Sequence, residues 1–259
     1  MDLGIQGKRA LVCASSRGLG RGCAEALAAA GVHLILNGRD ADVLAITAAD
    51  FRQRFQIEVQ EIAADITTDE GRESVLSQAV DIDILVNNAG GPPPGSWTDW
   101  QRDDFQQALD SNLLTPIFLM QALLPRMVEQ GWGRIVNITS GAVRSPIPAL
   151  GLSNMARTGL TGFVAGLSRQ VAGSGVTINN LLPGLHATDR LQVLDGHEAA
   201  LRGCPIEEVR AERLRSIPAG RYGTAQEFGA ACAWLCSVHA GFVVGQNIVL
   251  DGGQVNATL

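Results

Sequence analysis

Two residue types are nearly absent from this chain of 259 residues: it contains one tyrosine, Tyr222, and one lysine, Lys8. They lie near opposite ends of the sequence, so no Tyr-x-x-x-Lys arrangement can be drawn anywhere. Positive charge is also in deficit, because 20 Lys and Arg residues face 26 Asp and Glu residues, for a net charge of −6. This acidic balance argues against a nucleic-acid-binding protein, whose electrostatic footprint would be basic.

The chain offers little for disulfides or metal sites. Its five cysteines show no regular spacing, and an odd number argues against a disulfide framework. Cys232 and Cys236 are four residues apart in an apolar helical stretch, where either a metal pair or core packing is conceivable. Core packing fits better, because a free cysteine behaves as a small buried hydrophobe. The four histidines lack metal-ligand spacing, so we expect no metal site.

Signals for membrane insertion or export are missing as well. No apolar run approaches the roughly 18 residues of a membrane span. The segment Met1–Ile5 lacks the basic region, followed by an apolar one, that opens a signal peptide. Hydrophobic residues make up 46% of the chain, which is enough for a sizeable core. We therefore expect a soluble, cytoplasmic protein with no membrane partner.

Short apolar stretches alternate with helical patterns along the whole chain. We predict strands at about residues 9–14, 32–37, 57–63, 83–87, 134–138, 176–181 and 246–250. We predict helices at about residues 20–30, 41–54, 68–80, 103–130, 152–172 and 225–237. Continuous apolar strands joined by helices indicate a parallel sheet covered on both faces. The prediction is therefore a doubly wound, seven-stranded α/β fold of the Rossmann type, in a single domain over residues 1–259.

Two features depart from this regular alternation. Asp110-Ser111-Asn112 interrupts the 103–130 helical pattern with polar residues on a potentially inward face. Residues 184 to 218 form one long irregular region with scattered charge and two prolines. A segment of that length is typical of a functional lid or of disorder, and we expect it to cover the substrate.

Glycine and polar residues gather where strands end. The first strand leads into Ala14-Ser15-Ser16-Arg17-Gly18-Leu19-Gly20, in which Gly18 lets the backbone approach a pyrophosphate and Gly20 lets the helix pack close to the strand. Free N–H groups at the start of that helix favour an anion. Three later strands end in Asn87-Asn88-Ala89-Gly90, in Pro183-Gly184 with Thr188 soon after, and in Asp251-Gly252-Gly253. In a parallel sheet all of these lie at the carboxyl edge, where ligands bind.

Together these stretches resemble the short-chain dehydrogenase/reductase family, in its 3-oxoacyl-[acyl-carrier-protein] reductase-like branch. The resemblance runs from Gly7-Lys8-Arg9-Ala10 to Asp251-Gly252-Gly253 and implies a nicotinamide dinucleotide. Ala14 stands where the family has its first glycine, a change that is tolerated where φ is negative. The family pattern brings Asp65 to the adenine, Asn88, Ala89 and Gly90 to the adenosine ribose, and Thr188 to the nicotinamide amide. The full set of implied cofactor contacts is Ala14, Ser16, Arg17, Gly18, Leu19, Gly20, Asn37, Arg39, Asp65, Ile66, Asn88, Ala89, Gly90, Arg157, Pro183, Gly184 and Thr188.

The choice between the two dinucleotides follows from charge. A 2′-hydroxyl is held by a carboxylate at the end of the second strand, whereas a 2′-phosphate needs a cation. Here the strand ends in Asn37-Gly38-Arg39, so the expected carboxylate is an amide and an arginine follows it. Arg39 and Arg17 can clamp a phosphate dianion, although both can equally be solvated and Asp40 can reach back. We predict NADP(H) in preference to NAD(H).

The family's catalytic residues are Asn, Ser, Tyr and Lys. By strand and helix position Asn112 matches the Asn and Ser140 the Ser, but Ser153 and Arg157 stand at the Tyr and Lys positions. This match is fixed by Ser140 on one side and by residues 158–163 on the other. A serine hydroxyl is a weaker acid than a phenol and sits on a shorter side chain. Arginine stays protonated, so it cannot donate or accept a proton. A relay through His186, or a water held by Ser140, Ser153 and Asn112, is a possible replacement.

These residues leave three functions open. The first is an NADP(H)-dependent oxidoreductase that acts on a small carbonyl or alcohol substrate with a non-standard proton relay. The second is a dinucleotide-binding protein with little or no redox turnover, such as a sensor or a partner subunit. The third is a lyase or isomerase that reuses the pocket.

Arg144, in the loop after Ser140, can bind an anionic substrate group or remain solvated. The resemblance also implies a homo-oligomer, a tetramer or a dimer, built on the helices at 103–130 and 152–172 and on the last helix and strand.

Overall fold

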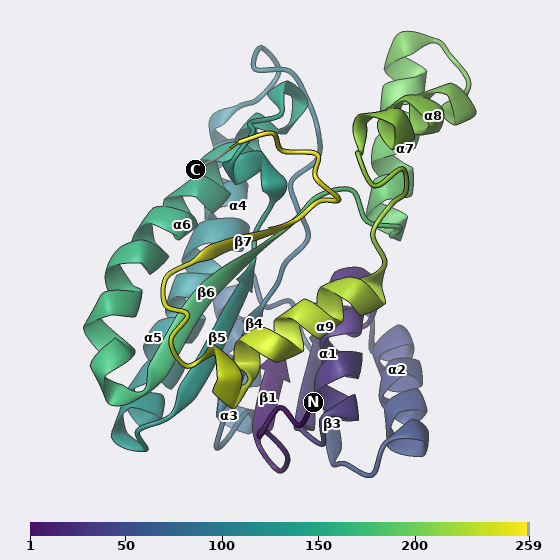
Figure 1. The fold of residues 1–259 in the computed structure, drawn as a ribbon. Coiled ribbons are helices and arrows are strands. Elements are labelled where there is room, and N and C mark those ends of the chain that lie inside the picture. The colour runs from purple at the N-terminus through teal and green to yellow at the C-terminus, as the bar shows by residue number, and fades with distance from the viewer. Residues whose placement is uncertain (258–259) are drawn as a thin grey trace.

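Apolar strands form the centre of the molecule. The computed structural model describes residues 1–257, and it joins the strands into a seven-stranded parallel sheet of order β3-β2-β1-β4-β5-β6-β7 (Figure 1). They are β1 (Arg9–Val12), β2 (His33–Gly38), β3 (Val59–Ala63), β4 (Ile84–Asn87), β5 (Gly133–Ile138), β6 (Val176–Pro183) and β7 (Asn247–Leu250). The order reverses between β1 and β4, which makes this the switch point where such sheets bind ligands. The predicted fold class is confirmed.

Helices cover both faces of this sheet, because successive strand residues point to opposite sides. Val12 and Leu36 belong to one apolar core, with α1 (Gly18–Ala29), α2 (Ala41–Arg54) and α9 (Ala225–Cys236). Their neighbours Leu11 and Ile35 belong to a second core on the other face. The helices of that face are α3 (Asp69–Gln78), α5 (Thr115–Glu129) and α6 (Gly151–Val171).

Helices α1 and α9 touch through their backbones. A Cβ atom at Gly22 would lie 2.2 Å from the carbonyl oxygen of Ala225, and one at Gly229 would lie 2.1 Å from that of Gly22. Cys232 and Cys236 are fully buried in the apolar core beside this contact, and both are free thiols. These two cysteines therefore pack as small hydrophobes.

The polar interruption in the 103–130 segment is a π-helical stretch. The segment forms α4 (Arg102–Leu109), a π-helical turn at Asp110–Leu114 and then α5. Pro116 has no N–H to donate to the carbonyl four residues earlier, so the regular helical hydrogen bonding cannot continue here. The Thr115 hydroxyl instead donates to the Asp110 carbonyl at 2.7 Å. Such turns are often found at functional sites, and this one holds the buried Asn112.

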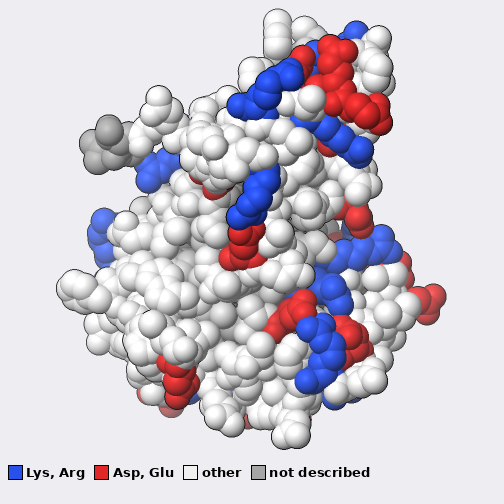
Figure 2. All heavy atoms as spheres, turned by 45° about the vertical axis from the view of Figure 1, so that its right-hand side comes forward, with Lys and Arg blue, Asp and Glu red and all other residues white. Residues whose placement is uncertain are grey.

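The prediction of an irregular region at 184–218 was wrong. It contains α7 (Asp189–Arg202) and α8 (Ile206–Ser216), which project from the body of the molecule at the upper right of Figure 1. Ion pairs join these two helices, whose apolar periodicity is weak. Arg202 of α7 pairs with Glu212 of α8, and Arg213 of α8 pairs with Glu198 of α7. Figure 2 accordingly shows acidic and basic side chains packed together on this lobe. No helix among residues 1–257 is both long and apolar enough to cross a membrane.

Candidate functional site

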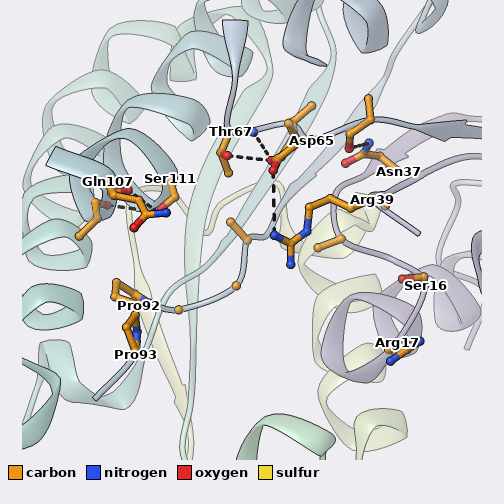
Figure 3. A pocket seen from close by; sticks show the side chains of 18 of the residues that line it. Ser16, Arg17, Asn37, Arg39, Asp65, Thr67, Pro92, Pro93, Gln107 and Ser111 are labelled. Atoms are coloured by element: carbon orange, nitrogen blue, oxygen red, sulfur yellow. Dashed lines mark hydrogen bonds and ion pairs between the residues drawn. The ribbon is translucent and has the colours of Figure 1, made fainter. Parts of the chain in front are cut away.

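A cleft opens at the carboxyl edge of the sheet. It encloses about 420 Å³ and is lined by residues that follow β1, β2, β3 and β4, together with residues of α4 and the π-helical turn (Figure 3). Several of the predicted cofactor contacts line it: Ala14, Ser16, Arg17, Asn37, Arg39, Asp65, Ile66, Ala89 and Gly90. The cleft therefore occupies the position expected for a dinucleotide at the switch point.

The turn after β1 is tightly folded. Ala14 has φ of +46° and Gly18 has φ of +56°, so the expectation that φ is negative at Ala14 was wrong. A Cβ atom at Gly20 would lie 2.3 Å from the Ala14 carbonyl oxygen, and the Asn88 amide donates to that same oxygen at 3.3 Å. The backbone of the turn thus folds directly onto the start of α1. Its free N–H groups are available to an anion there.

The end of β2 provides cations. The Asn37 side chain is buried and donates to the carbonyl oxygens of Ile62 and Ala64, both at 3.1 Å, so it binds β3. Arg39 is 80% exposed and lies 4.0 Å from Asp65, as Figure 3 shows. Arg17 lies 3.5 Å from Asp40.

Exposed ion pairs of this kind contribute little, so both arginines can turn toward a ligand. The glycine turn, the volume of the cleft and these two cations fit a dinucleotide with a 2′-phosphate. Asp40 also accepts a hydrogen bond from the Val43 N–H and so caps α2.

The part of the site around Ser140 is assembled from segments that lie far apart in the sequence. Thr188 caps α7, and its Cγ2 atom would lie 3.7 Å from a Cβ at Gly18, so α7 starts beside the glycine turn. A Cβ at Gly141 would lie 3.2 Å from the Pro183 carbonyl oxygen. Ser140 accepts a hydrogen bond from the Ala142 N–H at 3.1 Å. The Ser140 turn and the Pro183-Gly184 strand end therefore meet at one edge of the sheet. Leu19, like Gly18, Gly20, Asn88, Pro183, Gly184 and Thr188, is not among the residues that line the 420 Å³ cleft.

Ser153 and Arg157 lie one turn apart on α6, and both are buried. Arg157 donates from Nη1 to the Ile138 carbonyl at 2.7 Å and from Nη2 to the Ala89 carbonyl at 3.4 Å. It thereby links the end of β5 to the loop after β4. Burial, and secondarily the charge of Arg190, lower the pKa of Arg157 to about 10, so it stays protonated at neutral pH.

Asn112 lies beside this arginine. Its amide donates to the Gly90 carbonyl at 3.3 Å and accepts from the Ser111 hydroxyl at 3.1 Å. Asn112, Arg157 and Ala89 also line a second, small cavity of about 10 Å³. That is about the space of one water molecule.

Two residues considered from the sequence lie elsewhere. His186 is buried against Phe228, with ring centroids 5.3 Å apart, and its Nδ1 lies 3.2 Å from the Gly184 carbonyl oxygen. It lines neither of the two cavities. Arg144 is exposed. Within residues 1–257 no three His, Cys, Asp or Glu side chains are grouped as metal ligands.

Other residues of the cleft were not foreseen. Gly91, Pro92 and Pro93 line it from the loop after β4, and Gln107 and Ser111 line it from the α4 side. The position of Ser111 inside the polar interruption of the 103–130 pattern was the only sequence signal among them. Gly38, Ala64, Thr67, Asp104, Ala108 and Leu152 complete this group.

Comparison with known proteins identifies the family. The family model for enoyl-(acyl carrier protein) reductase matches residues 13–254. The chain is 31% identical over 260 residues to a 3-oxoacyl-[acyl-carrier-protein] reductase of Aquifex aeolicus, covering 98% of this chain and 100% of that protein. The chain belongs to the short-chain dehydrogenase/reductase family.

Solved structures of this family superpose over nearly the whole chain. L-sorbose reductase of Gluconobacter frateurii, complexed with NADPH and L-sorbose, has a TM-score of 0.93 at 27% identity, covering 99% of this chain and 100% of that one. A 3-oxoacyl-(acyl-carrier-protein) reductase of Agrobacterium tumefaciens with NADP bound has a TM-score of 0.87 at 30% identity, covering 97% and 95%.

Proposed function

We propose that this short-chain dehydrogenase/reductase is an NADP(H)-dependent oxidoreductase that acts on a carbonyl or alcohol substrate through a non-standard proton relay. The observation that carries the proposal is the 420 Å³ cleft that fits a dinucleotide, beside which the buried Ser153–Arg157 pair of α6 lies. The cofactor, when bound, supplies the hydride. The reductase names of the relatives and the NADPH or NADP in two of the similar structures support this class of chemistry.

The contacts to the cofactor follow the family pattern. Arg17 and Arg39 hold the 2′-phosphate, and Asp65 meets the adenine. Ala89 and Gly90 flank the adenosine ribose, and Thr188, at the start of α7, meets the nicotinamide amide. Helices α7 and α8 cover the substrate, which is the role we expected for residues 184–218. Replacing Arg39 by Asp is expected to move the preference from NADPH toward NADH.

Ser153 and Arg157 take the positions that hold Tyr and Lys in the family. Arg157 keeps a positive charge beside the reacting oxygen, because its pKa of about 10 leaves it protonated at neutral pH. That charge stabilises an oxyanion but supplies no proton. The hydroxyls of Ser140 and Ser153 orient the oxygen, and a water beside Asn112 passes it a proton while taking one from bulk solvent. Without a phenol acid, we expect turnover about 10²- to 10⁴-fold below that of a site with a positioned general acid.

The missing acid favours one competing function, a dinucleotide-binding protein with little or no redox turnover. NADPH binding and NADPH oxidation separate the two. Tight NADPH binding, followed by no oxidation across a panel of ketones, aldehydes and oxo esters, would contradict the oxidoreductase. A lyase or isomerase would convert substrate in the presence of the cofactor without any net change in NADPH absorbance.

A designed restoration of the acid makes the test sharper. In an oxidoreductase with a weak relay, Ser153→Tyr combined with Arg157→Lys is expected to raise an activity that already exists. If the double variant creates activity where the natural protein has none, the natural protein is a binding protein. Thr161→Ala, one turn further along α6, controls for disturbance of the helix.

A further inference from the structure

Two arginines from distant segments meet at Gly91. Arg190 comes from the first turn of α7, and Arg157 comes from α6. A Cβ atom at Gly91 would lie 3.5 Å from the Nη2 atom of Arg190 and 3.9 Å from the Nη2 atom of Arg157. Gly91 itself lines the cleft. The fold therefore brings two guanidinium groups together at Gly91, in the wall of the cleft.

Neither arginine forms an ion pair with a carboxylate in residues 1–257. Arg190 donates to the Pro92 carbonyl at 2.6 Å, and Arg157 donates to two carbonyls. Burial lowers the pKa of both groups, and the charge of Arg190 lowers the pKa of Arg157 further. Arg157 is buried, whereas Arg190 is exposed at the surface beside it. A buried charge is costly without a counter-ion, so Arg157 is short of one negative group, and Arg190 lies where it can hold that group.

Besides Arg157, the arginines buried within residues 1–257 are Arg72 and Arg134, and both have more partners than Arg157. Arg134 donates to three backbone carbonyls and lies over the ring of Trp132, 4.6 Å from its centroid. Arg72 pairs with Asp69. Each guanidinium has five N–H donors, and Arg157 and Arg190 together use three of their ten in the hydrogen bonds above.

The acidic residues of the cleft do not supply the missing charge. Asp65 accepts from the Thr67 N–H and hydroxyl and faces Arg39. Asp104 accepts from the Gln101 N–H as a helix cap. The cations for a 2′-phosphate, Arg17 and Arg39, are already provided at the outer end of the cleft.

We propose that the substrate carries a carboxylate, which Arg190 binds in the positive field of Arg157. This inference rests on the proposed function and names the substrate class for the same site. A carboxylate matches the planar fork of an arginine with two parallel hydrogen bonds. Ser153, which orients the carbonyl, precedes Arg157 by one helical turn, so carbonyl and carboxylate lie close together in the substrate. A short oxo acid meets both requirements.

Binding of acetoacetate and its methyl ester to the NADP⁺-loaded protein tests this proposal without turnover. We expect calorimetry to give acetoacetate at least about tenfold tighter binding than the ester, because a charge-assisted hydrogen bond contributes about 1.5–3 kcal/mol. Arg190→Met should abolish the difference, and Arg190→Lys should keep part of it. Arg169→Met removes an exposed arginine from α6 and should change the affinity for neither ligand. Thermal melting confirms that each variant is folded.

The result that overturns the proposal is equal binding of acid and ester by the natural protein. A second is an Arg190→Met variant that loses NADP⁺ affinity tenfold while the preference for the acid persists, because Arg190 would then serve the cofactor. Failure of the proposed function appears separately, as selective binding of acetoacetate with no NADPH oxidation by any carbonyl compound.

Discussion

Ala14 adopts a backbone conformation that its side chain disfavours. Its φ of +46° lies in the left-handed region, which costs an L-residue about 1–2 kcal/mol. The neighbouring turn depends on this conformation, because the Ala14 carbonyl oxygen faces both Gly20 and the Asn88 amide. The strain is therefore maintained by the turn after β1 itself, as is common at binding sites.

Glycine at this position should relieve the strain. We expect Ala14→Gly to raise the free energy of unfolding by up to about 1 kcal/mol, since the gain exceeds the roughly 0.5–1 kcal/mol entropic cost of glycine. Urea unfolding measures the change. Ala10→Gly, at a fully buried position of β1, is the matched control and should destabilise the protein. A destabilised Ala14→Gly variant would show that the methyl group packs favourably.

His186 should give the protein a pH-dependent stability. Burial lowers its pKa below the ordinary 6.5, and the Gly184 carbonyl and Glu227 oppose this shift only in part. Between the two pKa values the unfolded state binds more protons, so stability falls as the pH drops below about 6.5 and through the folded pKa. His186→Asn removes this contribution, and its unfolding free energy should decline less between pH 7.5 and 5.

The same variant tests whether His186 has any catalytic role. It loses the edge-to-face contact with Phe228, worth about 0.5–1.5 kcal/mol, but any turnover should persist at pH 7.5. Loss of turnover in a folded variant would show that His186 takes part in the proton relay. His197→Asn provides the control for removing an exposed imidazole.

At the scale of elements, apolar periodicity predicted what the sheet buries. All seven strands and five of the helices packed around them were anticipated to within a few residues, because each buries apolar side chains at a regular spacing. The predicted helix at 103–130 is divided into α4, the π-helical turn and α5. Helices α7 and α8 were missed because α8 buries only Val209. Their sequence signals were caps: Thr188 at the start of α7 and Gly203, with φ of +62°, at its end.

The hairpin of α7 and α8 should depend on one buried carboxylate. Asp195 is 1% exposed and lies 3.2 Å from Arg213 Nε and 3.4 Å from Arg210 Nε. Asp195→Ala leaves both cations without this partner and should lower the local stability by about 1–3 kcal/mol. Hydrogen exchange should accelerate across residues 189–216 and stay slow in the sheet. Glu207→Ala, at an exposed position of α8, is the control. Uniform acceleration would mean that the hairpin unfolds only with the whole molecule.

At the scale of the whole molecule, topology explains which parts of the site the sequence could locate. Ala14, Asn37, Asp65 and Ala89 lie at the carboxyl ends of parallel strands, and such ends must meet at one edge. Arg190 follows no strand directly, and it reaches the Pro92 carbonyl only because α7 begins beside the loop after β4. That contact is tertiary, between residues 98 positions apart, and no local pattern encodes it.

The exposed apolar side chains of the long helices predict an assembly. Phe118 on α5 is 41% exposed and Phe163 on α6 is 37% exposed. Both lie on helices that the family resemblance assigns to subunit interfaces. We expect the natural protein to be a tetramer or dimer at micromolar concentration in light scattering, and Phe163→Arg to shift it to a smaller species by burying a charge in the interface.

Ile46→Arg distinguishes this effect from a change in net charge. Ile46 is 70% exposed on α2, outside the predicted interfaces, and its replacement should leave the assembly intact. A monomeric natural protein would contradict the prediction directly. If both variants dissociated the assembly equally, the added positive charge would explain the effect wherever it is placed. The result would then give no support for an interface at Phe163.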